Sequence, residues 1–505
     1  MKRDLSFRSQ AVSSLLIGLF VLALLLGQTA CSRSSGDSLR FGLASAPITL
    51  DPRFATDATS ERINRLLYRR LVGFDENFLP VPSLATWRQI TPTQYEFILG
   101  KKGRIYHDST RLTSVDVKTT YDFILDPRNA SPHRKQLATI ERIETPDMDT
   151  IHFYLNRPDP LFPGRLSIGI MPASRMATGH DFSRIPIGSG PFAFMDWPNE
   201  GRLRLVRLAD GQTFEFLYVP DPTVRVLKLL RGEIDMLQND LPPELVAYLA
   251  KNENVQVIKG EGSNFTYLGF NLNDAIVGRL GIRRAIAYAL DREAIIKYVL
   301  GGAARPAAAL FLPHHWAGNP ALSAYPYSPE KAQTLLRQEG FGLDHPVYLT
   351  HKTSTDPFRI RLVTIIQNQL AKVGIDVQLR SYDWGTFYGD IKAGRFQMYS
   401  LTWVGIKTPD IFRTIFHSSA VPPEGANRGR FISTQADHLI ETAESSLDLK
   451  TQALYYRKLQ AYLFEELPYV PLWYEDHVFV ARRDLVGYTL AVDGNYDSLV
   501  SVNSR

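Results

Sequence analysis

The sequence has a single cysteine and lacks the short motifs that mark common hydrolases, metalloproteases and nucleotide-binding enzymes. No G-x-S-x-G, H-E-x-x-H, C-x-x-C or G-x-x-x-x-G-K-S/T pattern occurs in it. The only adjacent histidine pair, His314-His315, follows Pro313 in a loop-like stretch and has no clustered partner. We therefore expect no enzyme activity, no metal site and no cofactor.

The lone cysteine, Cys31, excludes an intrachain disulfide, and its position indicates another role. A basic start with Lys2, Arg3 and Arg8 precedes an apolar run over residues 11–26, which is the pattern of an export signal. The alternative, a membrane anchor helix, needs a longer run and a stop-transfer flank. Residues 1–30 are thus predicted to be a signal peptide and residues 31–38 a short flexible tether.

The chain also lacks a long low-complexity or proline-rich linker and a cluster of charge of one sign. Its 505 residues are enough for two or three domains, and 44% hydrophobic and 22% charged residues are typical of a soluble globular protein. The formal net charge of +5 is spread along the chain, which gives no case for nucleic acid as a partner.

The middle of the chain, residues 267–302, contains the most ordered pattern. A strand-like run from Tyr267 to Leu272 is followed by two helical patterns, the second capped by Asp291 and stopped by Gly301-Gly302. Such a strand and helix pair suits a crossing between two lobes, although an ordinary step inside one domain has the same pattern. Residues 185–192 carry Gly188 and Gly190 beside Pro191, which predicts a turn where backbone approaches backbone.

Residues 347–404 predict an α/β lobe with a mixed or parallel sheet. A strand over 347–350, a helix over 359–373 and a strand over 375–379 form a βαβ unit. A helix over 384–393 and a strand over 397–404 continue the alternation.

Several blocks together resemble the family 5 extracellular solute-binding proteins, the peptide and nickel receptors of ABC importers. The blocks are A-P-I-T-L-D-P-R near the start, H-D-S-T-R-L-T-S-V-D-V, P-I-G-S-G-P-F, R-G-E-I-D, and Y-L-G-F-N with I-R-R-A-I-A-Y-A-L-D-R-E-A-I-I. Thr29-Ala30-Cys31 is similar to a bacterial lipobox, in which the cysteine is lipid-modified, with Gln28 where leucine is typical.

The resemblance implies an α/β, bilobal, periplasmic-binding-protein-like fold with a hinge and an extra subdomain inserted in the first lobe. Lobe I would comprise residues 39–70, 186–267 and 471–505, the inserted subdomain residues 71–185, and lobe II residues 268–470. It further implies an exported protein, anchored to a membrane by a lipid on Cys31, that delivers a solute to an ABC transporter permease by closing its lobes. Peptides are the expected ligand; a nickel or haem receptor of the same fold and a lipid-anchored binding or signalling protein remain alternatives.

Ligand contact is expected in the segment Leu401–His417, where a predicted strand runs into a helix start. Trp403 is either a rigid wall of the ligand site or part of the core. Asp410 is either a ligand anchor or a charge at a helix N-terminus, and Arg413 is either a ligand contact or a solvated cation. The candidate set is completed by Asn271, Asn427 and Arg428.

This sequence also departs from the family's pattern at one position. In peptide receptors of the family, an aspartate shortly after the tryptophan pairs with the ligand's ammonium group, and here Ile406 stands in its place. Either Asp410 replaces that anchor or the ligand binds differently. Arg428 could meet a ligand carboxylate or serve the structure alone.

Overall fold

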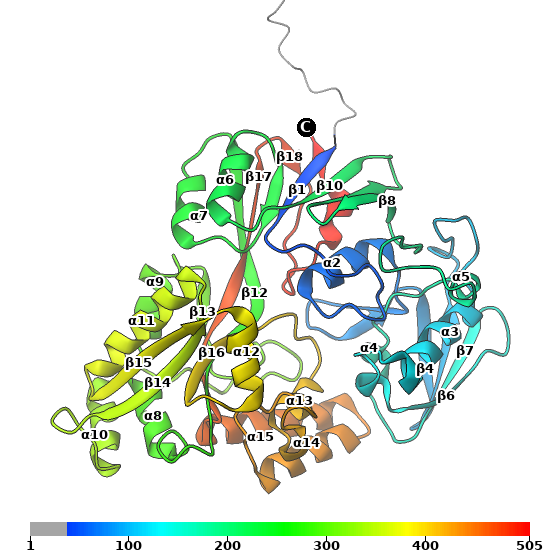
Figure 1. Ribbon diagram of the computed structural model, residues 1–505. Helices are drawn as coiled ribbons and strands as arrows, with labels where there is room; N and C mark the ends of the chain where they lie inside the picture. The colour runs from blue at the N-terminus through cyan, green and yellow to red at the C-terminus, as the bar shows by residue number, and fades with distance from the viewer. Residues whose placement is uncertain (1–37) are drawn as a thin grey trace, which may run out of the picture.

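The computed structural model describes residues 38–505 (Figure 1), so the predicted signal peptide and Cys31 lie outside the described residues. One sheet of eleven strands extends through both lobes. In spatial order its strands are β15 (Ile375–Tyr382), β14 (Val347–Ser354), β16 (Met398–Trp403), β12 (Val255–Phe270), β17 (Tyr469–Arg482), β11 (Met236–Gln238), β1 (Leu39–Leu43), β10 (Thr213–Tyr218), β9 (Arg202–Arg207) and β8 (Phe192–Asn199), with β13 (Ala304–Pro306) beside β17.

The two long strands β12 and β17 pass from one lobe to the other as an antiparallel pair (Figure 1). Their register shifts between Gly260 and Asn264, and a bulge of this kind bends a strand and increases its twist. Strand β12 begins at Val255, well before the run at Tyr267 that the sequence marks. The first half of β12 escapes recognition because its residues are mostly polar or glycine.

Lobe I is built around β1, β8, β9, β10 and β11. Helices α2 (Ala58–Leu67), α6 (Pro222–Leu230) and α7 (Pro243–Leu249) accompany these strands. Asp57 and Asp221 cap α2 and α6 through hydrogen bonds to backbone N–H groups of the first turn. The apolar core is rich in aromatic side chains, among them Phe41, Phe214 and Phe216.

A second, four-stranded antiparallel sheet forms a separate layer with its own core. Its order is β4 (Ala85–Thr91), β5 (Gln94–Leu99), β7 (Thr150–Leu155) and β6 (Ile140–Glu144), and α3 (Ser114–Leu125) packs on it. A capping box of Thr113 and Asp116 starts α3, and β6 and β7 form an antiparallel pair.

Lobe II has helices on both faces of its part of the sheet. They are α8 (Leu280–Ala289), α9 (Arg292–Tyr298), α10 (Pro329–Gln338), α11 (Pro357–Ala371), α12 (Trp384–Ala393), α13 (Ile411–Phe416), α14 (Thr434–Ser445) and α15 (Leu449–Glu466). The βαβ prediction is confirmed, because β14 and β15 pair in parallel with α11 between them in sequence. The predicted cap Asp291 begins α9, and Ser328 caps α10 in the same way.

Short elements complete the described chain. They are β2 (Val72–Phe74), β3 (Pro80–Pro82), β18 (Leu485–Val486), β19 (Asn503–Ser504), α4 (Phe162–Arg165) and α5 (Ala173–Ala177). Within residues 38–505, no helix combines the length and the apolar character that crossing a membrane requires.

The predicted close approach of backbone at Gly188 and Gly190 is confirmed. A Cβ atom at Gly188 would lie 1.9 Å from the carbonyl oxygen of Leu67, and one at Gly190 would lie 2.2 Å from that of Leu66. These contacts lock the end of α2 against the entry to β8. No side chain rotation can relieve them, because the clashing atoms belong to the backbone.

We expect Gly188→Ala and Gly190→Ala each to lower the free energy of unfolding by about 2 kcal/mol or more, since overpacking at a rigid contact forces the backbone to move. Gly389→Ala is the matched control: nothing lies within 4 Å of its Cβ position, and it sits inside helix α12. That control should be neutral or slightly stabilising. Denaturant unfolding measures all three, and an unaffected Gly188→Ala variant would contradict the packing described.

His351 on β14 generates a pH prediction. Its side chain is fully buried, and burial lowers the pKa of the imidazole to about 3. Because the unfolded chain takes up a proton near pH 6.5 and the folded chain does not, stability should fall as the pH drops from about 6.5 toward 3. In His351→Gln this slope should be smaller, by at most about 1.4 kcal/mol per pH unit. The exposed His314→Gln serves as control, and equal slopes in all three proteins would refute the assignment.

Candidate functional site

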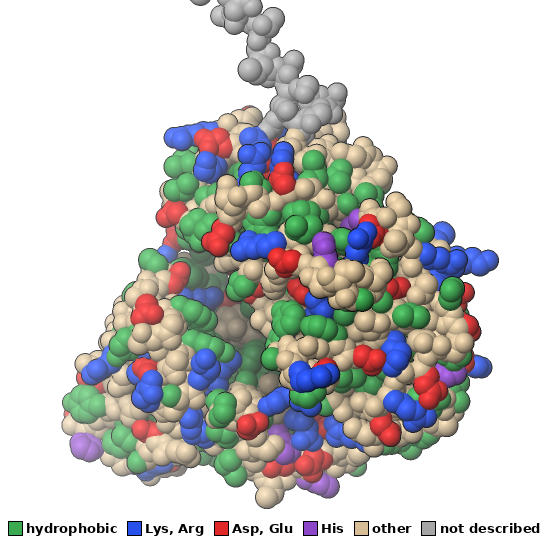
Figure 2. All heavy atoms as spheres, turned by 45° about the vertical axis from the view of Figure 1, so that its right-hand side comes forward, with side chains coloured by type: hydrophobic (Ala, Val, Ile, Leu, Met, Phe, Trp, Pro, Cys, Tyr) green, Lys and Arg blue, Asp and Glu red, His purple; other side chains and the backbone are tan. Residues whose placement is uncertain are grey.

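A cavity of about 600 Å³ lies between the two lobes. Lobe I lines it with Leu43–Ser45 after β1 and with residues 238–243 after β11. Lobe II lines it with Thr402 and Val404 at the end of β16 and with the start of α11. Figure 2 shows the surface hollowed where the upper lobe meets the lower left one.

The position of this cavity follows from the topology of the sheet. Strands β1 and β11 are parallel neighbours, and so are β14 and β16, so each lobe presents carboxyl ends of strands to the cleft. Ligands of open α/β sheets bind beyond such ends. A volume of about 600 Å³ is also within the range of small-molecule sites.

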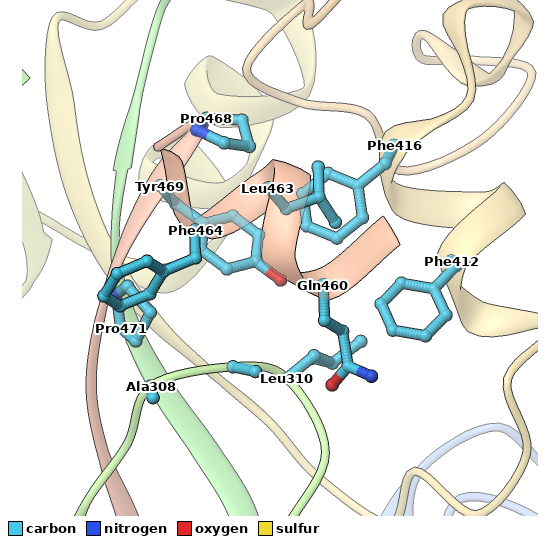
Figure 3. Close-up of a pocket in the computed structure, with 11 residues that line it drawn as sticks. Ala308, Leu310, Phe412, Phe416, Gln460, Leu463, Phe464, Pro468, Tyr469 and Pro471 are labelled. Atoms are coloured by element: carbon cyan, nitrogen blue, oxygen red, sulfur yellow. The ribbon is translucent and has the colours of Figure 1, made fainter. Parts of the chain in front are cut away.

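A second cavity, inside lobe II, is far smaller. It measures about 20 Å³ and lies between α15 and the loop at Ala308–Leu310, among apolar side chains (Figure 3). Gln460 and Tyr469 supply its polar atoms, and both Gln460 Oε1 and Tyr469 Oη are buried without a hydrogen bond partner. A space of this size suits one water molecule and no larger solute.

The large cavity is lined by four acidic and four basic side chains, which gives it a balanced charge. They are Asp240, Asp356, Glu475 and Asp476, and Arg62, Arg225, Lys259 and Arg359. The carboxylate of Glu475 accepts a hydrogen bond from Thr266 at 2.7 Å and lies 3.5 Å from Arg359. Asp476 pairs with Arg305 at 3.0 Å. Most of these charges therefore have partners within the protein.

Trp403 and Arg428 lie together, but away from this cavity. The Trp403 ring stacks beside Tyr267 with 6.4 Å between ring centroids, and the Arg428 guanidinium lies 4.7 Å from the Trp403 ring. Arg428 also donates hydrogen bonds to the hydroxyls of Tyr267 and Tyr388 at 3.1 and 3.0 Å. Tyr267 and Arg428 of this cluster line a small cavity of about 10 Å³.

The alternation of side chains along β16 explains the separation. Thr402 hydrogen-bonds Thr266 at 2.7 Å on the cavity face, so Trp403 points to the opposite face and Val404 returns to the cavity. Trp403 packs against the core of lobe II, and core packing was one of the two roles considered for it from the sequence.

Asp410 and Arg413 also have partners within the protein. The Asp410 carboxylate accepts a hydrogen bond from Thr408 and lies 3.7 Å from Arg165 at the end of α4. Arg413 pairs with Glu444 at 2.8 Å. Neither side chain lines the large cavity.

The two asparagines predicted as ligand contacts hold backbone in place. Asn427 Nδ2 donates to the carbonyl of Phe431 at 2.7 Å. Asn271 donates to the carbonyls of Gly394 and Phe396, each at 3.1 Å. For all six predicted residues, a role in ligand binding stays a prediction.

The sequence analysis did not single out Asp240, which lies two residues after the end of β11. Asn239 and Asp240 have φ values of 60° and 54°, a left-handed conformation that asparagine and aspartate tolerate better than other side chains. Two polar residues after a buried strand were the only available signal. Such residues are common in loops, so the signal alone does not indicate a site.

A partly buried ion pair connects the lobes. Lys407 Nζ, directly after Ile406, lies 2.6 Å from the Asp493 carboxylate in the C-terminal segment of lobe I. Lys407 and its neighbour cations hold the pKa of Asp493 well below its usual range, although burial acts in the opposite direction. The backbone carbonyl of Lys407 lies 3.0 Å from His315 Nε2, which fixes the loop that carries the lysine.

The fold is bilobal and α/β, with a cavity between the lobes that is large enough for a small solute. The chain belongs to the bacterial extracellular solute-binding proteins, family 5, whose sequence profile matches residues 80–421. The resemblance seen in the sequence, and the fold it implies, are thereby confirmed.

Individual relatives share most of the chain. It is 26% identical to the dipeptide-binding protein of Escherichia coli, over 92% of this chain and 94% of that protein. It is 27% identical to heme-binding protein A of Haemophilus influenzae, with 94% of each covered. Among solved structures, DppA of Helicobacter pylori in complex with the peptide STSA has a TM-score of 0.79 at 25% identity, covering 93% of this chain and 98% of that chain. NikZ of Campylobacter jejuni in complex with Ni(L-His) has a TM-score of 0.81 at 24% identity and covers 93% and 100%.

We expect Lys407→Met to open the ligand-free protein, because it leaves the Asp493 carboxylate buried without its cation, at a cost of about 3 kcal/mol. Small-angle X-ray scattering should show a larger radius of gyration. Lys135→Met is the matched control: its pair with Glu424, 3.0 Å apart, is 71% exposed on both sides, and exposed pairs contribute little. Equal radii of gyration for Lys407→Met and wild type would contradict the role of the pair.

Proposed function

We propose that this protein captures a peptide in the cavity between its lobes and presents it to the permease of an ABC importer. The observation that carries the proposal is the cavity itself, about 600 Å³ in volume and lined by both lobes with balanced charge. A peptide has an ammonium, a carboxylate and a polar backbone, so its charges match such a lining. The peptide-binding relatives support the same ligand class.

Closure is proposed to occur about β12 and β17. Only these two strands carry the main sheet from one lobe to the other, and their register shift offers a place where the backbone can bend. The permease would read the closed form. For the chain as a whole we keep the division predicted from the sequence, with lobe II over residues 268–470 and the inserted subdomain over residues 71–185.

The location is proposed from the sequence. The basic and apolar start of the chain and the lipobox-like Cys31 support export and a lipid anchor, which would keep the receptor near its permease. A receptor role without catalysis agrees with the family.

Nickel–histidine and haem are the competing ligands, because relatives carry these names. No group of three or more potential metal-binding side chains occurs in the described part of the chain. His477 does line the cavity, where its ring lies 3.0 Å from Asn239 and 3.0 Å from the carbonyl of Val492. Both ligands therefore belong in the test.

We expect di- to pentapeptides to raise the thermal unfolding temperature of the protein lacking residues 1–30 and carrying Cys31→Ser. A ligand at a hundred times its dissociation constant adds about 2.7 kcal/mol to the stability. Val404→Trp should fill the cavity and abolish the shift. Ile432→Trp, at a side chain that is 67% exposed and does not line the cavity, should preserve it.

A shift with nickel–histidine or haem and none with peptides would replace the peptide assignment. A peptide shift that survives Val404→Trp would place the ligand outside this cavity.

A further inference from the structure

One carboxylate on the cavity wall has no direct partner. The Asp240 side chain accepts no hydrogen bond and forms no ion pair with any group in residues 38–505, although it faces the solvent of the cavity. The backbone carbonyl of Asp240 accepts a hydrogen bond from Arg225, which anchors the loop without using the carboxylate. The left-handed backbone at Asn239 and Asp240 therefore presents an uncompensated negative group to the cleft.

A second acceptor without a donor lies on the same wall. Asn264 Oδ1 is buried and has no hydrogen bond partner, and the residue lines the cavity. Asn264 pairs with Glu475 across β12 and β17, and Glu475 lies near enough to Asp240 to repel it. Three acceptor side chains thus border one region, while a buried polar group normally finds a partner.

No cation of the cavity forms an ion pair with Asp240 within residues 38–505. Arg225 is occupied, since it donates to the carbonyls of Val219 at 2.6 Å, of Pro220 at 3.2 Å and of Asp240. Arg62 lies over the ring of Tyr496, 5.4 Å from its centroid. Burial raises the pKa of Asp240, while the attraction of Arg225, Arg62 and Arg359 acts in the opposite direction.

We infer that Asp240 binds a primary ammonium group of the ligand, with Asn264 Oδ1 as a further acceptor for its N–H groups. The inference rests on the proposed function and specifies it: the ligand enters as a cation at this point, and the ammonium site belongs to lobe I. An ammonium has three N–H donors and a full positive charge. It can therefore donate hydrogen bonds to the unpartnered acceptors and also offset the repulsion between the carboxylates, which a neutral group would not do. The absence of an aspartate at Ile406 of lobe II then does not remove the ammonium site, because lobe I supplies the carboxylate.

The test compares trialanine and trileucine with their N-acetylated forms, which lack the ammonium, by calorimetric titration at neutral pH. The wild type should bind each free peptide at least about tenfold more tightly than its acetylated form, the contribution of one charge-assisted hydrogen bond. In Asp240→Asn the two forms should bind alike.

Asp356→Asn is the matched control. Asp356 lines the same cavity, but its carboxylate caps α11 by accepting a hydrogen bond from the N–H of Arg359 at 2.8 Å. Asparagine is an equally good cap, so this variant makes the same charge change without unfolding the helix. It should keep the preference for free peptides.

The outcomes separate the two proposals. If the wild type binds the peptides and Asp240→Asn still prefers the free forms, the ammonium site is wrong and the peptide function stands. An equal loss of preference in Asp356→Asn would assign the effect to the net charge of the cavity and would also overturn the inference. If neither peptide pair binds the wild type, the peptide function fails and the inference is withdrawn with it.

Discussion

The antiparallel pairing of β12 with β17 is the constraint on which the rest of the structure depends. The two strands pair through hydrogen bonds in lobe I and again in lobe II. Between these two paired stretches the register shifts, from Gly260 to Asn264. Each lobe is therefore a well-packed body attached to the same two strands. Because the strands leave the sheet continuous, the carboxyl ends of the neighbouring strands in both lobes face one cleft.

The cleft combines two kinds of electrostatics. Charges that close the lobes, such as Lys407 and Asp493, are paired within the protein and mostly buried. Charges that face the cavity are partly unpaired, with Asp240 as the clearest case. A receptor needs both paired and unpaired charges. The paired charges favour closure of the lobes, and the unpaired charges of the cavity are satisfied only when the ligand supplies the opposite charge. The position of Lys407 directly after Ile406 suggests that this loop serves closure in this protein.

Local signals predicted much of the fold. The cap at Asp291 is a short-range hydrogen bond, and the βαβ unit of lobe II has clear periodicity, so both predictions were confirmed. The first half of β12 was missed because its pairing with β17 is a long-range interaction that leaves no periodic trace in a glycine-containing, polar stretch.

The site was harder to predict than the fold. The segment around Trp403 was correctly expected at the end of a strand, and the cavity touches its neighbours Thr402 and Val404. The direction of the Trp403 side chain depends on which face of β16 meets the cleft, and sequence spacing cannot supply that information. Asp240 and this strand end line one cavity only because two segments far apart in the sequence meet in the folded chain.

A crystal structure of the protein with a bound peptide would test the central claim most directly. The account predicts ligand density between the ends of β11 and β16, with the peptide's amino terminus against Asp240 and Asn264. Density on the other face of β16, against Trp403 and Arg428, would contradict it.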